Sequence, residues 1–293
     1  MFDLLVYIRN VENLVRCNDP VVTGIILADR YFSSSNAGLE NEEIKKAVDI
    51  IHGLGKKALL KVDRLYSQKE LEMVRQYLLF LADCKVDGII YTDLGIKMMM
   101  EELHIGYKGI YAPETLLTDY YDINTLKNDG IDNCVISKDI PLKDVYEIIE
   151  ECPDYCYLRI HGPILIAYSR RKYITSYLEM PGDYSEDYWL VEESRDNRLP
   201  LIEKENGSWL YDATLQSFNE IRKLNETALK GALIDNVYLS DEYTLKTLKL
   251  YESVLNGGIT AKEAINELKE FDETVRYADI NELKETWLDK EKA

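Results

Sequence analysis

The feature that most constrains the fold is a repeated unit in which a short apolar run precedes a longer segment with helical spacing. Residues 23–27 form one such run, rich in β-branched side chains, and residues 39–52 follow it. Within that second segment Ile44, Val48 and Ile51 fall on one face of a helix, and charged residues fall opposite. Strands that alternate with helices in this way form parallel βαβ units.

The same unit recurs along the chain. The expected strands are apolar and are bounded by turn-forming residues, and they lie at 4–8, 23–27, 58–62, 87–91, 107–111, 133–136, 155–160 and 232–234. Eight such units favour closure into one (β/α)8 barrel of the TIM type over a doubly wound open sheet. The length of 293 residues suits a single barrel domain, residues 1–293.

The regular alternation breaks after the seventh strand. Residues from about 180 to 212 are expected to form a small antiparallel β insertion, in which Asn206-Gly207 is a strong hairpin signal. A helix is expected over 215–229, before the eighth strand. The segment from about 258 to 293 is expected to form a C-terminal helical extension.

Charge and cysteine usage exclude several classes of protein. The formal net charge of −18 argues against a chain-wide footprint for DNA or for an anionic membrane, although a local basic cluster can still bind RNA. The first residues lack a secretory signal, and no apolar run reaches the ~18 residues that span a bilayer. Five scattered cysteines fit reduced thiols. We therefore expect a soluble cytoplasmic protein.

Several segments, taken in order, resemble one known family. They are 32–36, 55–57, 86–90, 93–95, 160–162, 167–171, 176–178, 195–201 and 205–207. Their sequences (for example Ile160-His161-Gly162) and their spacing are similar to those of the collagenase-like peptidases, peptidase family U32.

The resemblance implies a barrel and a bacterial cytoplasmic protein. It also implies functions other than peptide hydrolysis, because several relatives are RNA- or quinone-hydroxylation factors that carry an iron–sulfur cluster. One branch makes 5-hydroxyuridine at the tRNA wobble position and draws on prephenate. In some Gram-positive bacteria a longer and a shorter member divide that task, and this chain resembles the shorter one. The expected partners are then tRNA and a cluster-bearing paralogue.

The chain departs from the family where the cluster is bound. Leu165 and about Lys172 stand where cluster-bearing relatives have cysteines, and no cysteine lies between Met180 and Trp189. An iron–sulfur cluster needs converging thiolates, so we expect no cluster and no other cofactor or metal. The family's Glu-Gly-Arg after the eighth strand is also altered, to about Asp235-Asn236-Val237.

Four residues near expected strand ends are the candidate catalytic groups. They are His161, Glu114, Asp93 and Asp235. Barrel active sites form at the C-terminal ends of the strands, where such groups can act as acids, bases or hydrogen-bond donors. Two alternatives stay open, because His161 could be a buried structural histidine and Asp93 could cap the helix that follows it.

Four further residues are candidates for substrate binding: Arg64, Tyr168, Arg170 and Arg171. Guanidinium groups pair with phosphate or carboxylate, and aromatic rings stack on bases. The basic run could equally be a solvated helix face, and the aromatic rings could pack at a protein interface.

Two rival functions remain at this stage. A stand-alone peptidase or hydrolase would agree with the family name, but the sequence has no His-Glu-x-x-His zinc motif, and Ser169 has no evident partner besides His161. A non-catalytic scaffold is the other rival. A deep polar barrel mouth would argue against the scaffold, and a mouth filled by apolar side chains would argue for it.

Overall fold

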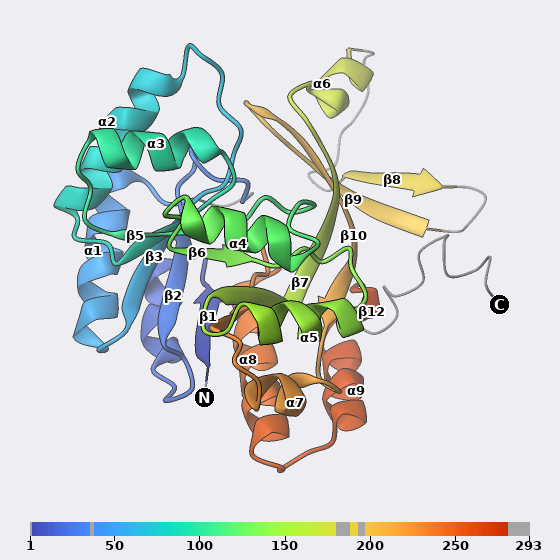
Figure 1. Cartoon of the computed structure of the whole chain (residues 1–293). Helices are drawn as coiled ribbons and strands as arrows, with labels where there is room; N and C mark the ends of the chain where they lie inside the picture. The colour runs from blue at the N-terminus through green and yellow to red at the C-terminus, as the bar shows by residue number, and fades with distance from the viewer. Residues whose placement is uncertain (1, 36–37, 180–187, 193–196, 281–293) are drawn as a thin grey trace.

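Parallel strands close into a barrel at the centre of the molecule (Figure 1). The computed structural model describes residues 2–35, 38–179, 188–192 and 197–280. Around the barrel the order is β1 (Asp3–Tyr7), β2 (Gly24–Ala28), β3 (Lys57–Val62), β4 (Gly88–Tyr91), β5 (Lys108–Tyr111), β6 (Asn133–Val135), β7 (Cys156–Ser169) and β11 (Gly231–Ile234). Strand β11 pairs in parallel with both β7 and β1, which closes the ring. The predicted TIM-like barrel is therefore confirmed, and the open sheet is excluded.

Helices cover the outside of this barrel (Figure 1). They are α1 (Asn41–Gly53), α2 (Leu71–Asp83), α3 (Leu94–Glu102), α4 (Tyr120–Asn128), α5 (Leu142–Glu151), α7 (Ile221–Asn225) and α8 (Asp241–Leu255), with a 3-10 helix, η1 (Val11–Cys17), after β1. Helix α9 (Ala261–Phe271) follows α8 and contacts it. Among the described residues, none of the helices has both the length and the apolar character that a bilayer crossing needs.

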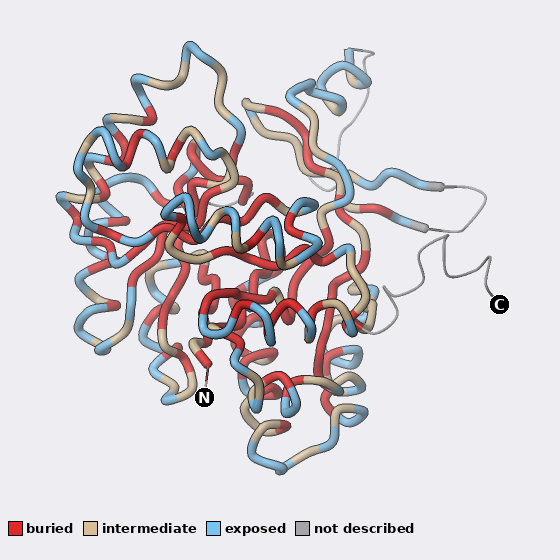
Figure 2. Tube along the Cα trace, in the orientation of Figure 1, coloured by how far each residue is buried: buried red, intermediate tan, exposed pale blue. Residues whose placement is uncertain are grey.

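Alternation along the strands separates two apolar layers, which appear as the buried centre of Figure 2. On β3, Ala58 and Leu60 face the helices, whereas Leu59 faces the interior of the barrel. The interior layer also contains Leu5, Tyr7, Ile26, Ala28, Ile90, Ile110, Ala112, Val135, Tyr157 and Leu233. The next inward position on β3 is Lys61. The packed apolar interior therefore ends in charged side chains toward the C-terminal ends of the strands.

The predicted antiparallel insertion is present and projects from the barrel (Figure 1). Strand β7 continues beyond the barrel and pairs with β10 (Gly207–Gln216), which pairs in turn with β9 (Asn197–Lys204) and then β8 (Tyr188–Glu192). The predicted Asn206-Gly207 hairpin is confirmed, since Gly207 pairs with Lys204. At φ +149°, with the Ser169 carbonyl oxygen 2.3 Å from where a Cβ would lie, position 207 requires glycine.

Two expectations about secondary structure are wrong. Strand β7 does not end at Ile160, and the helix expected over 215–229 is replaced by the end of β10 and by the short helix α7. Leu215 instead pairs with Gly162 of β7 and is buried. The extension of β7 offers Leu215 a backbone partner and an apolar surface, and tertiary pairing of this kind overrides local helix preference.

The C-terminal segment is not helical throughout. After α9, residues Tyr277–Asp279 form β12, which pairs in parallel with β10. The last part of the expected helical extension falls on residues 281–293, which lie outside the described part of the chain.

Candidate functional site

A cluster of charged side chains lies at the C-terminal mouth of the barrel. Lys61 is an inward position of β3, and Arg159 is the inward position that follows Tyr157 on β7. Asp63 comes directly after β3, and Asp235 directly after β11. Glu114 lies in the loop after β5, with a positive φ of 67°. The regular alternation of the strands thus places all five residues at one end of the barrel.

These side chains form a connected ion-pair network. Lys61 Nζ lies 2.7 Å from Asp235 Oδ2 and 3.4 Å from Asp63 Oδ2. Arg159 binds Glu114 through both terminal nitrogens, at 2.7 and 3.2 Å, and its Nη2 lies 3.6 Å from Asp235 Oδ2. The carboxylate of Asp235 therefore lies between the two cations and links the two halves of the network.

The loop after β2 supports this network from one side. Ser34 donates to Asp63 twice, from its backbone nitrogen and from its hydroxyl, both at 2.7 Å. Ser35 Oγ hydrogen-bonds to the hydroxyl of Tyr7, and the ring of Tyr7 lies under Lys61 Nζ, 5.2 Å from it. The orientation of Asp63 is thus fixed by a cation and by two hydrogen bonds.

The network holds Glu114, Asp63 and Lys61 in their charged forms. Burial alone would raise the pKa of Glu114, but the charge and hydrogen bonds of Arg159 outweigh it and lower that pKa. The pKa of Asp63 is lowered in the same way, against burial, by Lys61 and Ser34. Burial opposes the charge of Lys61, yet Asp235 and Asp63 raise its pKa. At neutral pH these three side chains are therefore fixed charges.

A cavity of about 250 Å³ opens above the network. Asp63 and Glu114 of the network line it, together with Tyr168 and Trp209, whose rings pack against each other. The remaining lining residues are Ser34, Arg64, Leu65, Thr92, Pro113, Thr115, Leu165, Ile166 and Ala167. The mixture of apolar walls with a few converging polar groups is typical of a small-molecule site.

Unpartnered polar atoms occur in the charged network at the mouth and in the lining of this cavity. Within the described residues, Arg159 Nε, Asp235 Oδ1, Arg64 Nε and the hydroxyl of Tyr168 are buried without a hydrogen-bond partner. Buried polar atoms are nearly always paired in native proteins, and exceptions mark sites where a ligand or water completes the pairing. The mouth is therefore the strongest candidate for a ligand site.

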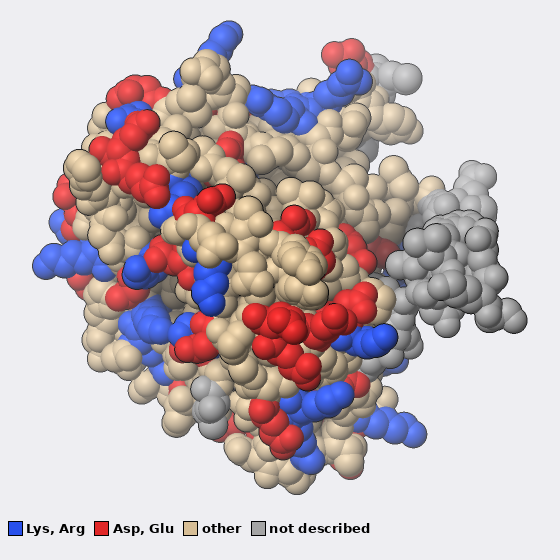
Figure 3. All heavy atoms as spheres, viewed as in Figure 1, with Lys and Arg blue, Asp and Glu red and all other residues tan. Residues whose placement is uncertain are grey.

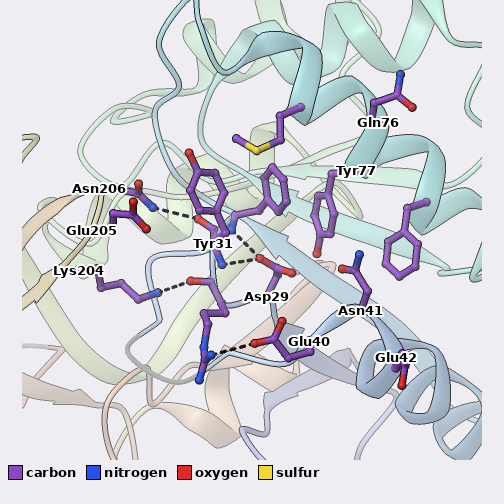
Figure 4. A pocket seen from close by; sticks show the side chains of 14 residues that line it. Asp29, Tyr31, Glu40, Asn41, Glu42, Gln76, Tyr77, Lys204, Glu205 and Asn206 are labelled. Carbon is purple, nitrogen blue, oxygen red and sulfur yellow. Dashed lines mark hydrogen bonds and ion pairs between the residues drawn. The ribbon is translucent and has the colours of Figure 1, made fainter.

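A larger cleft of about 900 Å³ lies outside the mouth, between α1, α2 and the tip of the β9–β10 hairpin (Figure 4). Two of its charged groups, Asp29 and Lys204, hold the loop after β2. Asp29 accepts the backbone N–H groups of Tyr31 and Phe32, and Lys204 donates to the carbonyls of Arg30 and Ser33. Because these groups already have structural partners, we assign this cleft a supporting role.

His161 is not part of the mouth. Leu233 pairs with Arg159 and Ile234 with His161, so Ile160 is an extra residue that forms a β-bulge on β7. The bulge turns the fully buried imidazole toward α8, where its nitrogens lie 3.0 Å from Tyr243 Oη and 3.3 Å from Tyr251 Oη. Burial lowers the pKa of His161 to about 3. Its geometry corresponds to the structural alternative, not to a catalytic group.

Asp93 also has a structural position. Its carboxylate accepts the backbone N–H of Gly95 at 2.9 Å as the N-cap of α3. Of the four candidate catalytic residues, the structure thus brings Glu114 and Asp235 together at the mouth and leaves His161 and Asp93 elsewhere.

Of the four candidate binding residues, the structure places two at the mouth and two outside it. Arg64 and Tyr168 line the mouth cavity, and Tyr168 packs against Trp209 at a ring distance of 5.0 Å. Arg64 is buried and pairs with Glu70 at 2.9 Å. Arg170 is exposed and also pairs with Glu70, at 3.2 Å. Arg171 is exposed beyond the end of β7.

Sequence reasoning missed Lys61 and Arg159, the two cations of the network. A signal for both was present, because each is a charged residue within an otherwise apolar strand, at a position that alternation directs into the barrel. Ser34 and Tyr211 had no comparable signal. Tyr211 comes to the mouth only because β10 runs across it, and burial together with nearby Asp63 raises its pKa well above the usual value.

The cysteines do not fit an iron–sulfur cluster. All five are buried, and none lines the mouth cavity. Cys134 and Cys156 have sulfur atoms 3.9 Å apart, but they pack in the layer between the strands and the helices. A cluster needs converging thiolates at its site, and the mouth offers none.

The sequence comparison decides the family. The profile of peptidase family U32 matches residues 24–293. This chain belongs to peptidase family U32. Similarity to curated members is low in identity but long in extent. The tRNA hydroxylation protein P2 of Bacillus subtilis is 23% identical over 278 residues, which cover 92% of this chain and 90% of that protein.

Other family members match over part of their length. The tRNA hydroxylation protein P1 of Bacillus subtilis is 20% identical over 74% of this chain but only 53% of its own length. Among solved structures, the U32 peptidase Mk0906 aligns with a TM-score of 0.47 and 14% identity, over 60% of this chain and 74% of that structure. This U32 chain therefore corresponds in extent to the shorter relative, P2.

Proposed function

We propose that this U32 protein acts in the hydroxylation of tRNA wobble uridine, as a cluster-free subunit or accessory factor. The observation that carries the proposal is the similarity to tRNA hydroxylation protein P2, which extends over nearly the full length of both chains. P1, a longer relative in the same organism, matches over about half its length. Such a role would place the chain in the cytoplasm of a bacterium.

The barrel mouth supports a ligand-binding role over a purely structural one. A scaffold would be expected to fill the mouth with apolar side chains. The mouth instead contains five charged residues above the apolar interior, together with a cavity and unpartnered polar atoms. Burying that many charges without a ligand to contact costs stability, so their presence argues for binding.

The electrostatics favour binding and orientation over proton transfer. A general acid or base works best when its pKa lies near the working pH. Glu114 and Asp63 have lowered pKa values, and Lys61 has a raised one, so each keeps its charge at neutral pH. We therefore assign the oxidative chemistry to a cluster-bearing paralogue and assign binding of the substrate to this chain.

The stand-alone peptidase is less well supported by the geometry. The ring nitrogens of His161 face Tyr243 and Tyr251, and the hydroxyl of Ser169 accepts the backbone N–H of Arg171. Ser169 and His161 therefore do not form the hydrogen-bonded pair that a serine nucleophile needs. Within the described residues, no group of three or more His, Cys, Asp or Glu side chains could hold a metal ion.

The test is genetic. We expect a strain lacking this chain to lose most 5-hydroxyuridine from its tRNA, and the wild-type gene to restore it. The content is measured by mass spectrometry of tRNA nucleosides. Normal 5-hydroxyuridine in the deletion strain would overturn the proposal, and peptide hydrolysis by the purified protein would favour the peptidase.

A further inference from the structure

The projecting insertion carries an open groove lined by aromatic side chains. The groove has a volume of about 520 Å³. It is formed by the outer half of β7, by α6 (Tyr173–Tyr177), and by β8, β9 and β10. Its most exposed rings are Tyr177 at 77%, Tyr173 at 50% and Trp189 at 43%. Exposed rings grouped in this way mark a surface that binds something.

A basic run borders the groove. Arg170, Arg171 and Lys172 are consecutive and exposed, immediately before the first ring of α6. Lys and Arg atoms gather along the upper edge of the molecule in Figure 3, over the region where Figure 1 shows α6 and the end of β7. In a chain with a net charge of −18, this local positive edge is complementary in charge to an anionic ligand.

Specific contacts hold the groove in shape. The carboxylate of Glu203 on β9 accepts the backbone N–H groups of Ile174 and Thr175 at the start of α6. Ser208 of β10 accepts the N–H of Tyr173 and donates to the carbonyl of Arg171. The short helix and the basic run are thus tied to the β-sheet and present their rings and charges in a fixed arrangement.

The groove adjoins the barrel mouth across β7 and β10, because Ser208 and Leu210 line the groove whereas Trp209, between them, lines the mouth. Ala167 and Tyr168 line both cavities. Tyr168 packs on Trp209, which lines the mouth, and its hydroxyl is one of the buried unpartnered groups. A chain-like ligand that passes over β7 at Ala167 and Tyr168 can place one of its units in the mouth while its neighbours stay on α6 and β8.

We propose that this groove binds single-stranded RNA and directs one nucleotide into the barrel mouth. In this arrangement Tyr173, Tyr177 and Trp189 stack on successive bases, and Arg171 and Lys172 contact phosphates. Aromatic platforms beside a positive edge are the general means by which proteins bind unpaired nucleic acid. The inference rests on the proposed function and deepens it, because it assigns the RNA to a defined surface.

Two observations favour RNA over a protein partner. The first is charge, since stacking rings and consecutive cations together match a strand that alternates bases with phosphates. The second is the connection to the mouth through Tyr168, because a protein interface has no need to lead into a small charged cavity. A paralogue docked on the same apolar rings is the competing outcome that the experiment must separate.

The test measures RNA binding by the full-length protein. The probe is a short fluorescent RNA hairpin with an unpaired uridine-containing loop, and a fully paired duplex of similar length serves as the comparison. We expect preference for the hairpin. The double variant Tyr177→Ala/Trp189→Ala should weaken that binding by at least about thirty-fold, since two rings are removed and stacking contributes about 1–3 kcal/mol per base. Lys172→Ala should lower the slope of log affinity against log salt by about 0.7.

Matched controls separate the groove from general surface effects. Tyr121→Ala removes a tyrosine that is 72% exposed on α4, away from the groove, and Lys262→Ala removes an exposed lysine of α9. Both controls should bind the hairpin as wild type does. Equal binding by wild type and the groove double variant would overturn the proposal, as would a failure of the wild-type protein to prefer the hairpin.

The RNA-binding experiment and the deletion strain test the groove and the proposed function separately. If the deletion strain loses 5-hydroxyuridine but the groove variants bind RNA normally, the proposed function stands and the RNA groove is rejected. Loss of a co-purifying paralogue from the groove variants, with RNA binding intact, would reassign the groove to protein docking. Normal 5-hydroxyuridine in the deletion strain rejects the proposed function whatever the binding result.

Discussion

Lys61 Nζ lies 2.7 Å from Asp235 Oδ2, although 174 residues separate the two in sequence. Both side chains are nearly buried, at 3% and 7% exposure. Strands β3 and β11 are not neighbours in the barrel, since β1 and β2 lie between them. The pair therefore spans the mouth and depends on closure of the barrel.

Replacing Lys61 should destabilise the protein strongly. Lys61→Met leaves Asp235 and Asp63 buried without their shared cation, and loss of one partner of a buried pair costs about 3–5 kcal/mol. Urea unfolding should show this decrease in the free energy of unfolding. The double variant Lys61→Met/Asp235→Leu should recover only part of the stability, because Asp63 still lacks its cation, and it should remain unable to restore tRNA hydroxylation.

Lys57 offers the matched control on the same strand. Its ion pair with Asp3 is exposed, with 55% of the lysine side chain accessible, so Lys57→Met should change stability by less than about 1 kcal/mol. Equal effects of the two lysine substitutions would contradict the importance of the buried network.

The two-fold contact between Arg159 and Glu114 depends on the shape of the guanidinium. Arg159→Lys keeps the charge but cannot bind both carboxylate oxygens at once. We expect a loss of about 1–2 kcal/mol in the free energy of unfolding and a clear loss of 5-hydroxyuridine in a complemented deletion strain. Arg75→Lys, at the more exposed pair with Glu102, is the control and should restore hydroxylation fully. Full restoration of 5-hydroxyuridine by Arg159→Lys would show that the two-fold contact of Arg159 is not needed for function.

Local sequence patterns predicted the walls of the barrel well, because its strands and helices have strong and regular periodicity. The insertion was found through the turn preference of Asn206-Gly207. The helix expected over 215–229 failed because the partner of Leu215 is Gly162, on the continuation of β7. A local sequence pattern cannot show that two segments this far apart in the sequence pair with each other.

The site was harder to predict than the walls. Glu114 and Asp235 were found because they follow strands, and side chains at strand ends converge in a barrel. His161 was misplaced because a single extra residue, Ile160, changes the face on which it lies. A bulge of one residue leaves no signal in composition or periodicity. Beyond it, each side chain lies on the face of the strand opposite to the one that alternation predicts.

Substitution of Asp93 tests whether this residue caps α3 or takes part in catalysis. Asp93→Ala removes the N-cap of α3 and should cost about 1 kcal/mol in the free energy of unfolding, without loss of tRNA hydroxylation. Asp93→Asn should retain most of the capping. Thr260→Ala, which removes the N-cap of α9, is the matched control for a similar loss. If Asp93→Ala abolished hydroxylation while an equally destabilised Thr260→Ala did not, Asp93 would belong to the catalytic machinery after all.

The decrease in the free energy of unfolding at acid pH should depend on His161. Burial lowers its pKa in the folded protein to about 3, whereas an unfolded chain protonates histidine near its ordinary pKa of about 6.5. Between these values the unfolded state binds one more proton than the folded state, so stability falls as the pH falls. The loss attributable to this residue is about 1.4 kcal/mol per pH unit below about 6.5.

His161→Gln keeps hydrogen-bonding groups near Tyr243 and Tyr251 but cannot titrate. Urea unfolding at a series of pH values between 7 and 5 should therefore show a shallower pH dependence for the variant, by about one proton. The variant should also restore tRNA hydroxylation, because the imidazole faces α8 and not the mouth. Identical pH dependence in the two proteins, or a stable His161→Gln variant without hydroxylation, would show that His161 has a role that its buried position does not explain.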